Sequence, residues 1–297
     1  MKEMLPTKRE AGVRRLWRAS LPAESAGLAW LGQAGFALRF EGCHFLIDPY
    51  LSDSLAEKYR GTEFPHDRLM PAPVEPGQIH SLDWVFCTHR HSDHMDPGSL
   101  PLLARANASC RFVVPRAERQ AALRAGVPPD RLVAVNAGES LSLSENATAQ
   151  AVAAAHETLQ VNERGEHHFL GFIFKTPRLV WYHSGDCVPY DGLAGKLLDS
   201  KIDAALLPVN GRDAYRAGRG IAGNFTFAEA RQLCVDAHIP CLVAHHFGMF
   251  AFNTPSLAEL RQEAGRAVSG SSCVLPAMES YYLLQQGQSG MPSIAEL

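Results

Sequence analysis

A short polar segment directly after an apolar strand constrains this chain most. Residues 84–88 are typical of a fully buried strand, and residues 89–96 hold three histidines and two aspartates. Ligands on a loop that is anchored by a rigid strand end are well held, as a metal site requires. A single His-x-His pair would be read more simply as a polar surface loop. The full His-x-His-x-Asp-His string favours metal binding instead.

The spacing within this loop predicts two metal sites. His89 and His91 are two residues apart, so they can point the same way from an extended backbone. Asp93 and His94 are adjacent, so their side chains must diverge. One short loop can therefore supply ligands to two neighbouring ions.

Three other strand ends carry candidate partners for this loop. His156 and Asp186 each follow an apolar run, and a glycine before Asp186 permits a tight turn. His245 and His246 together end the apolar run of residues 241–244. Each of these residues alone is more often structural than ligating. Polar residues at four strand ends are, however, what we expect when one edge of a layered fold carries the active site.

The remaining pattern predicts a layered α/β architecture. The expected strands and helices are as follows: strands at 28–31, 36–40, 44–47, 84–88, 111–114, 131–135, 140–143, 147–154, 169–175, 178–183, 204–208 and 241–244; helices at 99–107, 116–125, 191–199, 226–237 and 256–267. Ser256 and Glu259 form a capping-box pattern. We expect an N-terminal extension over residues 1–25, a single domain over 26–285 and a mobile Gly/Ser-rich tail over 286–297.

Composition argues against several classes of function. The net charge of −3 and the scattered basic residues do not suit a general nucleic-acid binder. The sequence lacks an apolar run of the roughly 20 residues that a membrane span needs, and residues 1–22 lack the apolar core of a signal peptide. The seven cysteines are far apart and odd in number, which favours reduced thiols. We expect a cytoplasmic protein that acts on a small molecule, alone or as a homo-oligomer.

These motifs resemble the metallo-β-lactamase superfamily and, more narrowly, its branch that contains ascorbate-6-phosphate lactonase. Residues 89–94 match the signature string of the superfamily. The other matching pieces lie in chain order at residues 30–36, 47–49, 155–157, 183–186, 208–213 and 246–250. The resemblance implies a four-layer αββα sandwich with the metals at one edge of its two sheets. This chain is shorter than the lactonase and carries His156 where that enzyme has another residue, which weakens any inference about its substrate.

The resemblance also implies a complete set of ligands for two ions. Three ligands would hold the first ion, three the second, and one would bridge both: His89, His91 and His156; Asp93, His94 and His246; and Asp186. His246 is preferred because residues 247–250 match the segment that follows the family's ligand, and His245 stays as the alternative. Five imidazoles and two carboxylates suit Zn²⁺, Mn²⁺ or Fe²⁺.

Further roles follow from this ligand set. Asp93 is expected to be catalytic, by accepting a hydrogen bond from a metal-bridging hydroxide and passing a proton to the leaving group. Asp48 and Glu157 are candidates for orienting the ligating histidines. Substrate contacts are expected from the loop that follows residues 204–208: Asn210, Arg212 and Asp213. The planar guanidinium of Arg212 would suit a carboxylate or a phosphate.

The leading hypothesis for function is hydrolysis of an ester-like bond in a small substrate, a lactone or a sugar-acid phosphate lactone. The alternative is a metal-dependent phosphodiesterase that acts on an RNA end or a phospholipid-derived substrate. A third class is non-hydrolytic, either a di-iron redox centre or a scaffold without catalysis. Redox relatives usually replace one loop histidine with a carboxylate, and here all three histidines are present.

Overall fold

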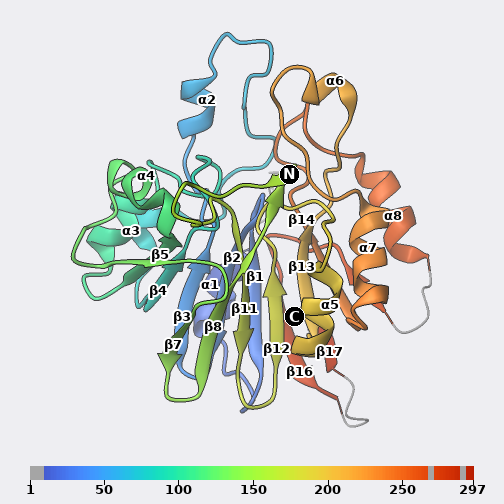
Figure 1. Ribbon diagram of the computed structural model, residues 1–297. Coiled ribbons are helices and arrows are strands. Elements are labelled where there is room, and N and C mark those ends of the chain that lie inside the picture. The colour runs from blue at the N-terminus through green and yellow to red at the C-terminus, as the bar shows by residue number, and fades with distance from the viewer. Residues whose placement is uncertain (1–9, 267–270, 288–291) are drawn as a thin grey trace, which may run out of the picture.

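The computed structural model describes residues 10–266, 271–287 and 292–297 (Figure 1). Its strands form two large sheets and one small ribbon. The first sheet contains, in spatial order, β17 (Pro292–Glu296), β16 (Tyr281–Gln286), β1 (Ala26–Gly32), β2 (Gly35–Phe40), β3 (Cys43–Ile47), β4 (Trp84–Phe86), β5 (Arg111–Pro115) and β6 (Leu132–Val135).

The second sheet contains, in spatial order, β15 (Ser272–Val274), β14 (Cys241–His245), β13 (Ala204–Pro208), β12 (Val180–His183), β11 (Leu170–Lys175), β8 (Ala147–Ala153) and β7 (Ser140–Ser144). The ribbon pairs β9 (Ala155–His156) with β10 (Thr158–Leu159). The α-helices are α1 (Gly12–Arg18), α2 (Ser54–Lys58), α3 (Leu100–Ala106), α4 (Arg119–Arg124), α5 (Leu193–Ser200), α6 (Ala214–Ala217), α7 (Phe227–Asp236) and α8 (Leu257–Gly265). Two 3₁₀ turns lie at Pro76–Gln78 and Arg116–Glu118.

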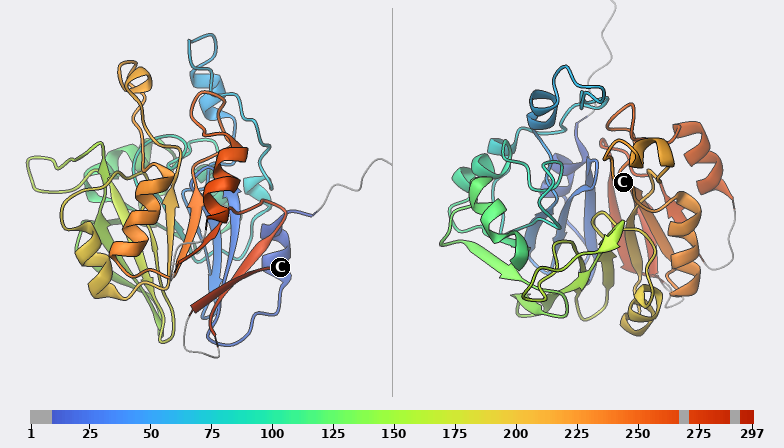
Figure 2. Two further views of the ribbon diagram at one scale, coloured as in Figure 1. Left: turned by 90° about the vertical axis from the view of Figure 1, so that its right-hand side faces the viewer. Right: turned by 45° about the horizontal axis from the view of Figure 1, so that its top comes forward.

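The two sheets pack face to face, and helices cover the outer face of each (Figures 1 and 2). Helices α1, α3 and α4 lie against the first sheet, and α5, α7 and α8 lie against the second. The alternation of side chains along each strand explains these layers. In β3, Phe45 and Ile47 belong to the core between the sheets, whereas Leu46 packs under the helices of the first sheet. The expected αββα sandwich is confirmed.

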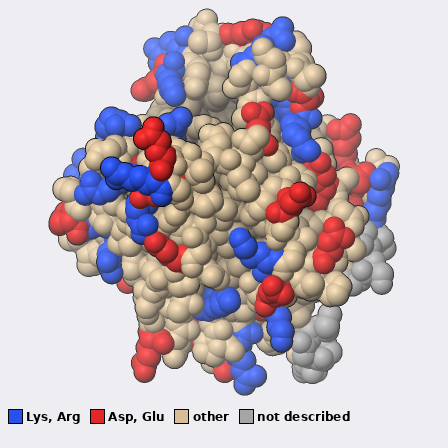
Figure 3. Space-filling model, in the orientation of Figure 1, with Lys and Arg blue, Asp and Glu red and all other residues tan. Residues whose placement is uncertain are grey.

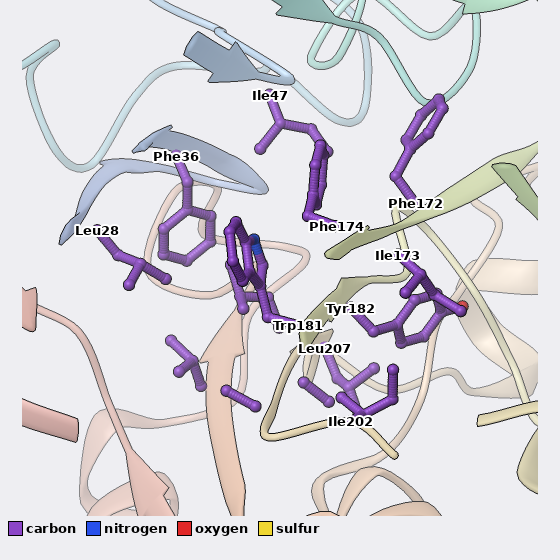
Figure 4. Packing of buried hydrophobic residues seen from close by; sticks show 14 of the residues in the cluster. Leu28, Phe36, Ile47, Phe172, Ile173, Phe174, Trp181, Tyr182, Ile202 and Leu207 are labelled. Carbon is purple, nitrogen blue, oxygen red and sulfur yellow. The ribbon is translucent and has the colours of Figure 1, made fainter. Parts of the chain in front are cut away.

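Aromatic rings join the two sheets (Figure 4). The Phe45 ring of β3 stacks on Phe174 of β11 with centroids 5.0 Å apart, and Phe40 of β2 meets Trp181 of β12 edge to face at 4.6 Å. Each such ring buries a large apolar area, so these contacts dominate the energetics of the core. They also fix how the two sheets align, and hence how their ends meet.

The strand directions bring the predicted ligands to one rim. β3, β4, β5 and β6 run parallel to one another, as do β12, β13, β14 and β15. β8 and β12 are both antiparallel to β11, so β8 runs in the same direction as β12. The carboxyl ends of parallel strands share an edge, where ligands of α/β folds usually bind.

The described parts of both chain ends contain secondary structure. Within the expected extension, α1 packs against β1, and Val13 and Leu16 are buried there. Within the expected mobile tail, Pro292–Glu296 forms the edge strand β17 along β16. That prediction is therefore wrong for these five residues, because pairing with β16 orders them. Residues 1–9 and 288–291 lie outside the described part. Among the described helices, none combines the length and the apolar character that a membrane crossing needs.

Candidate metal centre

Four strand ends bring the seven predicted ligands together. They form two groups in which the ligand atoms of each group lie within 4.8 Å of one another. The first half-site contains His89, His91, His156 and Asp186, and the second half-site contains Asp93, His94 and His246. Residues 89–94 follow β4, His156 ends the ribbon strand β9, Asp186 follows β12 and His246 follows β14. The rim that the sequence predicts therefore gathers all seven side chains.

Asp186 lies between the two half-sites and offers one carboxylate oxygen to each. Its Oδ1 is 3.2 Å from His94 Nε2 and 3.3 Å from His246 Nε2. Its Oδ2 is 3.8 Å from His156 Nε2. This is the placement that a carboxylate bridging two cations requires.

Several buried polar atoms of this cluster lack a partner in the described part of the chain. His89 Nε2, His94 Nε2 and Asp186 Oδ1 make no hydrogen bond there. Although His94 Nε2 and Asp186 Oδ1 are close, their geometry does not make a hydrogen bond. A buried polar group without a partner is costly, and a cation in each half-site would satisfy these atoms, His89 Nε2 in the first and His94 Nε2 with Asp186 Oδ1 in the second. The donor set of imidazoles and carboxylates suits a borderline divalent cation.

The protonation of the histidines also suits ligation. Burial lowers the pKa of His156 to about 4 and holds the pKa of His89 well below its usual range. Both imidazoles are therefore neutral near pH 7, and the neutral imidazole is the form that binds metals.

His94 differs from them. Burial opposes its protonation, but the nearby carboxylates of Asp186, Asp48 and Asp93 outweigh burial and raise its pKa well above the usual range. Without a cation, the proton on His94 balances part of this negative charge.

Asp48 contacts a ligand as the sequence predicts. His94 Nδ1 donates to Asp48 Oδ2 at 2.7 Å, while the Thr88 backbone N–H and hydroxyl also donate to this carboxylate at 2.8 and 2.7 Å. Asp48 is fully buried and has a φ of +47°, which side-chain-bearing residues rarely adopt. These bonds fix the ring of His94 and leave its Nε2 facing Asp186.

Glu157 does not take the orienting role that the sequence predicts for it. Its side chain is exposed, and within the described residues it makes no hydrogen bond to a ligand. The reason is local: Glu157 lies in the turn between the paired residues His156 and Thr158 with a φ of +68°, and there its side chain is exposed. The prediction for Glu157 is wrong.

The residues predicted to contact the substrate make contacts within the protein instead. The guanidinium of Arg212 donates twice to Glu229 at 2.6 Å and once to the Asn224 carbonyl at 3.1 Å, so its donor fork is occupied. Asp213 caps α6 by accepting from the Arg216 backbone N–H. None of the predicted substrate residues lines the cleft over the metal centre: Asn210, Arg212 and Asp213.

Asn210 lies closer to the cleft than the other two. It is buried, and its amide group bonds Asn253 at 2.9 Å and Asn224 at 3.1 Å. Asn253 lines the cleft, and Asn210 bonds it from the buried side, so Asn210 helps to hold this wall of the cleft in place. The expected substrate contacts from this loop are therefore corrected to structural roles.

A cleft of about 860 Å³ opens above the ligands. Figure 3 shows this hollow near the top of the molecule, between the segments that carry α2 and α6 in Figure 1. The segment with α2 supplies one wall: Leu55, Lys58, Tyr59, Thr62, Glu63, Phe64 and His66. The opposite wall contains Arg219, Gly220, Ile221, Ala222 and Asn253. The floor consists of predicted ligands and their neighbours: Arg90, His91, Ser92, Asp93, His156, Asp186 and His246. The wall residues are absent from the predicted site, because they lie in the short helix α2 and in loops, without a strand-end pattern.

The structure separates the two adjacent histidines that end β14. The His246 ring joins the second half-site, whereas the His245 ring is fully buried and stacks on His183 with centroids 4.8 Å apart. The backbone explains the difference, because His246 has a φ of +59° and turns out of the strand. The geometry thus favours His246 as the ligand.

Gln33 belongs to the same neighbourhood, although the sequence predicts no role for it. It is almost fully buried, and its Nε2 donates to Asp93 Oδ2 at 2.8 Å and lies 3.1 Å from His246 Nε2. Its position in the turn between β1 and β2, with a φ of +51°, brings it to the rim. The only signal in the sequence is its place in the matching segment of residues 30–36.

Comparison with known proteins matches residues 44–247 to the family model of the beta-lactamase superfamily domain. A metal-dependent hydrolase of the UPF0173 group from Hyperthermus butylicus is 30% identical over 199 residues, which are 65% of this chain and 76% of the relative. Another from Caldivirga maquilingensis is 28% identical over 186 residues, 62% of this chain and 70% of the relative.

Solved structures share the fold. An isothiocyanate hydrolase from Delia radicum gut bacteria superposes with a TM-score of 0.67 at 18% identity, over 86% of this chain and 98% of the other. CmlA, a diiron β-hydroxylase from Streptomyces venezuelae, gives a TM-score of 0.61 at 17% identity, over 94% of this chain and 55% of the other. At these identities the likeness extends to the fold alone, which hosts different reactions.

Proposed function

The chain belongs to the beta-lactamase superfamily domain family, and from that premise we propose that it is a hydrolase dependent on two divalent cations. The observation that carries this proposal is the carboxylate of Asp186, whose two oxygens face the two half-sites separately. The relatives named above as metal-dependent hydrolases support it. The ligand set is compatible with Zn²⁺, Mn²⁺ or Fe²⁺.

When bound, a pair of divalent cations supplies an activated water and polarises a carbonyl or phosphoryl oxygen. The protein's own residues keep bulk water away from the ligands and hold the transferred proton. Three of the ligands are nearly closed to bulk water, since the side chains of His94, Asp186 and His246 are at most 5% exposed. Asp93 lines the cleft and its side chain keeps 16% exposure, so its carboxylate can accept a proton and return it to a leaving group.

We propose an ester-like bond of a small substrate, a lactone or a sugar-acid phosphate lactone, as the target. An anionic group on the substrate would meet Arg90, which lies between two predicted ligands and lines the cleft. Its side chain is 60% exposed, and its nearest carboxylate, Glu118, is 4.0 Å away. Glu118 already accepts from His168 Nδ1 at 2.6 Å, so the guanidinium of Arg90 is available to a substrate. Arg90 thus takes the role expected of Arg212.

A phosphodiesterase is the second candidate. Lys58, Arg90 and Arg219 all line the cleft, and three cations beside a metal centre would suit a phosphodiester as well as a phosphorylated lactone. Glu63 neutralises Arg219 in part by accepting from its Nε at 2.9 Å. We rank the lactone first because of the resemblance of the motifs.

Metal analysis of protein purified without chelator, combined with lactone and phosphodiester assays, tests the function. Two equivalents of metal and turnover of lactones are expected. His91→Ala should lose metal and activity, whereas His238→Ala, on the surface after α7, should lose neither. Protein that binds no metal, or that turns over neither class, would contradict the proposal. Faster turnover of phosphodiesters would favour the second candidate.

Arg90→Gln tests the anionic group. It should lower kcat/KM about tenfold for a phosphorylated lactone, a cost of about 1.4 kcal/mol, and leave a neutral lactone within twofold. An equal effect on both substrates would argue against a direct contact.

We also propose that the protein works in a reducing compartment such as the cytoplasm. All seven cysteines are free thiols and six of them are buried, which suits a reducing environment.

A further inference from the structure

The turn between β1 and β2 packs tightly against the rim of the metal centre. The carbonyl of Gln33 accepts from the Trp30 indole N–H at 3.0 Å and from the His246 backbone N–H at 2.9 Å. A Cβ on Gly32 would come within 2.8 Å of Met249 Cε, and one on Gly35 within 2.9 Å of the Asp48 carbonyl. The backbone contact excludes a side chain at Gly35, whereas at Gly32 the φ of +91° disfavours one and the near neighbour is the flexible end of Met249.

Gln33 occupies this position with an unfavourable backbone conformation. Its φ of +51° is uncommon for a residue that carries a Cβ, and such conformations cost of order 1–3 kcal/mol. Glycine would relieve the strain but would remove the side chain. A long polar side chain held in this conformation, buried and aimed at two predicted ligands, points to a role for the side chain itself.

The contacts of Gln33 complete the support of the second half-site. His94 is oriented by Asp48. Asp93 Oδ2 accepts from Gln33 Nε2. His246 Nδ1 has no hydrogen-bond partner among the described residues, and the His246 backbone N–H donates to the Gln33 carbonyl at 2.9 Å. Gln33 Nε2 also lies 3.1 Å from His246 Nε2, the ring nitrogen that faces Asp186 and would bind the cation, so with a cation bound this amide can donate to Asp93 only.

The first half-site is different. His89 Nδ1 faces the Thr88 hydroxyl at 3.0 Å, and the rings of His89, His91 and His156 pack around Phe169. Gln33 makes no hydrogen bond to these histidines in the described structure. Its influence is thus confined to one half of the centre.

We propose that Gln33 is a positioning residue that sets the affinity of the second half-site for its cation. The inference rests on the proposed two-cation function. A ligating residue depends on the groups that orient it, and removing such a group typically costs 10–100-fold in metal affinity. The Gln33 side chain orients Asp93, while its backbone carbonyl holds the backbone of His246. Through Asp93 the side chain decides whether the second cation is retained at low metal concentration.

The test is a titration of chelator-treated protein with Zn²⁺ or Mn²⁺, followed by calorimetry. Gln33→Asn keeps an amide that is too short to reach Asp93, and asparagine tolerates a positive φ. Gln33→Met keeps the length and removes the donor. Both variants should bind the first ion within twofold of the wild type and the second ion about 10–100-fold more weakly. Gln232→Met, on the exposed face of α7, is the matched control and should bind both ions normally.

The outcomes separate this inference from the function on which it rests. Wild-type protein that binds no pair of ions would contradict the proposed function. Wild-type protein that binds two ions, with both Gln33 variants retaining them at wild-type affinity, would overturn the inference alone. Equal weakening of both ions, together with a lower melting temperature of the metal-free variants, would also overturn it, because it would show a general structural role. If Gln33→Met fails to fold, Gln33→Asn decides.

Discussion

Asp93 has the most exposed side chain of the second half-site, 16% against 0% for His94 and 3% for His246. Its Oδ2 is 3.7 Å from both His94 Nε2 and His246 Nε2, and its side chain also borders the open cleft. It can therefore hold a cation and exchange a proton with a substrate. The neighbouring histidines are buried and serve the first purpose only.

Asp93→Asn separates these two purposes. The amide keeps an oxygen for ligation but cannot accept the proton, so kcat should fall by at least about 100-fold. Metal content should stay close to that of the wild type. Steady-state kinetics and metal analysis of the same preparation check both statements, with the exposed Asp130→Asn as a control. Unchanged hydrolysis by Asp93→Asn would count heavily against the proton-transfer role.

Asp48→Asn tests the orienting contact to His94. Asparagine can still accept from the Thr88 backbone N–H, but it loses the negative charge beside His94 Nδ1. The affinity for the second cation should fall about 10–100-fold. Competition with a chromophoric chelator measures this change. Wild-type affinity in this variant would mean that packing alone orients His94.

Whether the role of a single residue can be predicted from the sequence depends on how far along the chain its contacts lie. The strand ends that carry candidate ligands could be predicted because each apolar run is encoded next to them in the sequence. The complete set of seven, and the choice of His246 over His245, came from the resemblance to the superfamily. Arg212 could not be placed in this way, because its partner Glu229 lies on α7 and already forms a capping box with Thr226. Gln33 was missed for the same reason, since its contacts lie 60 and 213 residues away along the chain.

Two segments rise above the metal centre and touch each other over the cleft. One carries α2 and continues to Glu63 and Phe64, and the other carries α6 (Figure 1). Glu63 Oε1 accepts from Arg219 Nε at 2.9 Å and from the Tyr215 hydroxyl at 3.2 Å. The Phe64 and Tyr215 rings meet edge to face at 6.4 Å. These contacts join the segments on the two sides of the cleft.

Glu63→Gln should loosen the contact between the two segments. The Glu63–Arg219 pair is exposed, so its loss should change the free energy of unfolding by less than about 1 kcal/mol. The KM for a substrate that fills the cleft should instead rise several-fold, with kcat within twofold. The exposed pair of Glu24 and Arg178 lies away from the cleft, which makes Glu24→Gln the matched control. Equal KM values for the two variants would dissociate the contact from substrate binding.

At the scale of elements, the sequence predicts what is locally encoded and misses what depends on distant partners. β4 and β13 are continuous apolar runs, and α8 begins with the Ser256–Glu259 capping box that its sequence indicates. β16 was missed because its place is set by pairing with β1, as in the register of Leu284 with Ala26. β17 pairs only with β16 among the described strands and exposes much of its length, so it lacks an apolar signature.

At the scale of the whole molecule, cation binding and folding should be coupled. The ligands come from segments of both sheets, so a bound pair of cations links the two halves of the sandwich. A ligand that binds only the folded state at 100 times its Kd adds about 2.7 kcal/mol to the free energy of unfolding. Chelation should therefore lower the melting temperature by several degrees. His91→Ala should show a much smaller shift on chelation, and an equal shift would place the stabilising metal elsewhere.

The pair of buried imidazoles behind the metal centre should make stability depend on pH. His183 and His245 are stacked and almost fully buried, and burial is the main cause that lowers the pKa of both. In the unfolded chain each imidazole has an ordinary pKa of about 6.5. Below that pH the unfolded state takes up protons that the folded state excludes, so the stabilising effect of neutral His183 and His245 is present above pH 6.5 and is lost on acidification.

Between its folded-state and unfolded-state pKa, each such histidine lowers the free energy of unfolding by at most about 1.4 kcal/mol for each pH unit of acidification. Urea unfolding of metal-free protein at pH 7.5, 6.0 and 5.0 measures the slope summed over all titrating groups, which include His89 and His156 as well as His183 and His245. His245→Leu removes one titrating group while leaving the ligands in place, so its free energy of unfolding should fall less steeply with acidification than that of the wild type. The comparison of slopes does not depend on the absolute cost of the substitution. Parallel curves would mean that His245 binds its proton equally in the folded and unfolded states, and its burial between the sheets argues against that outcome.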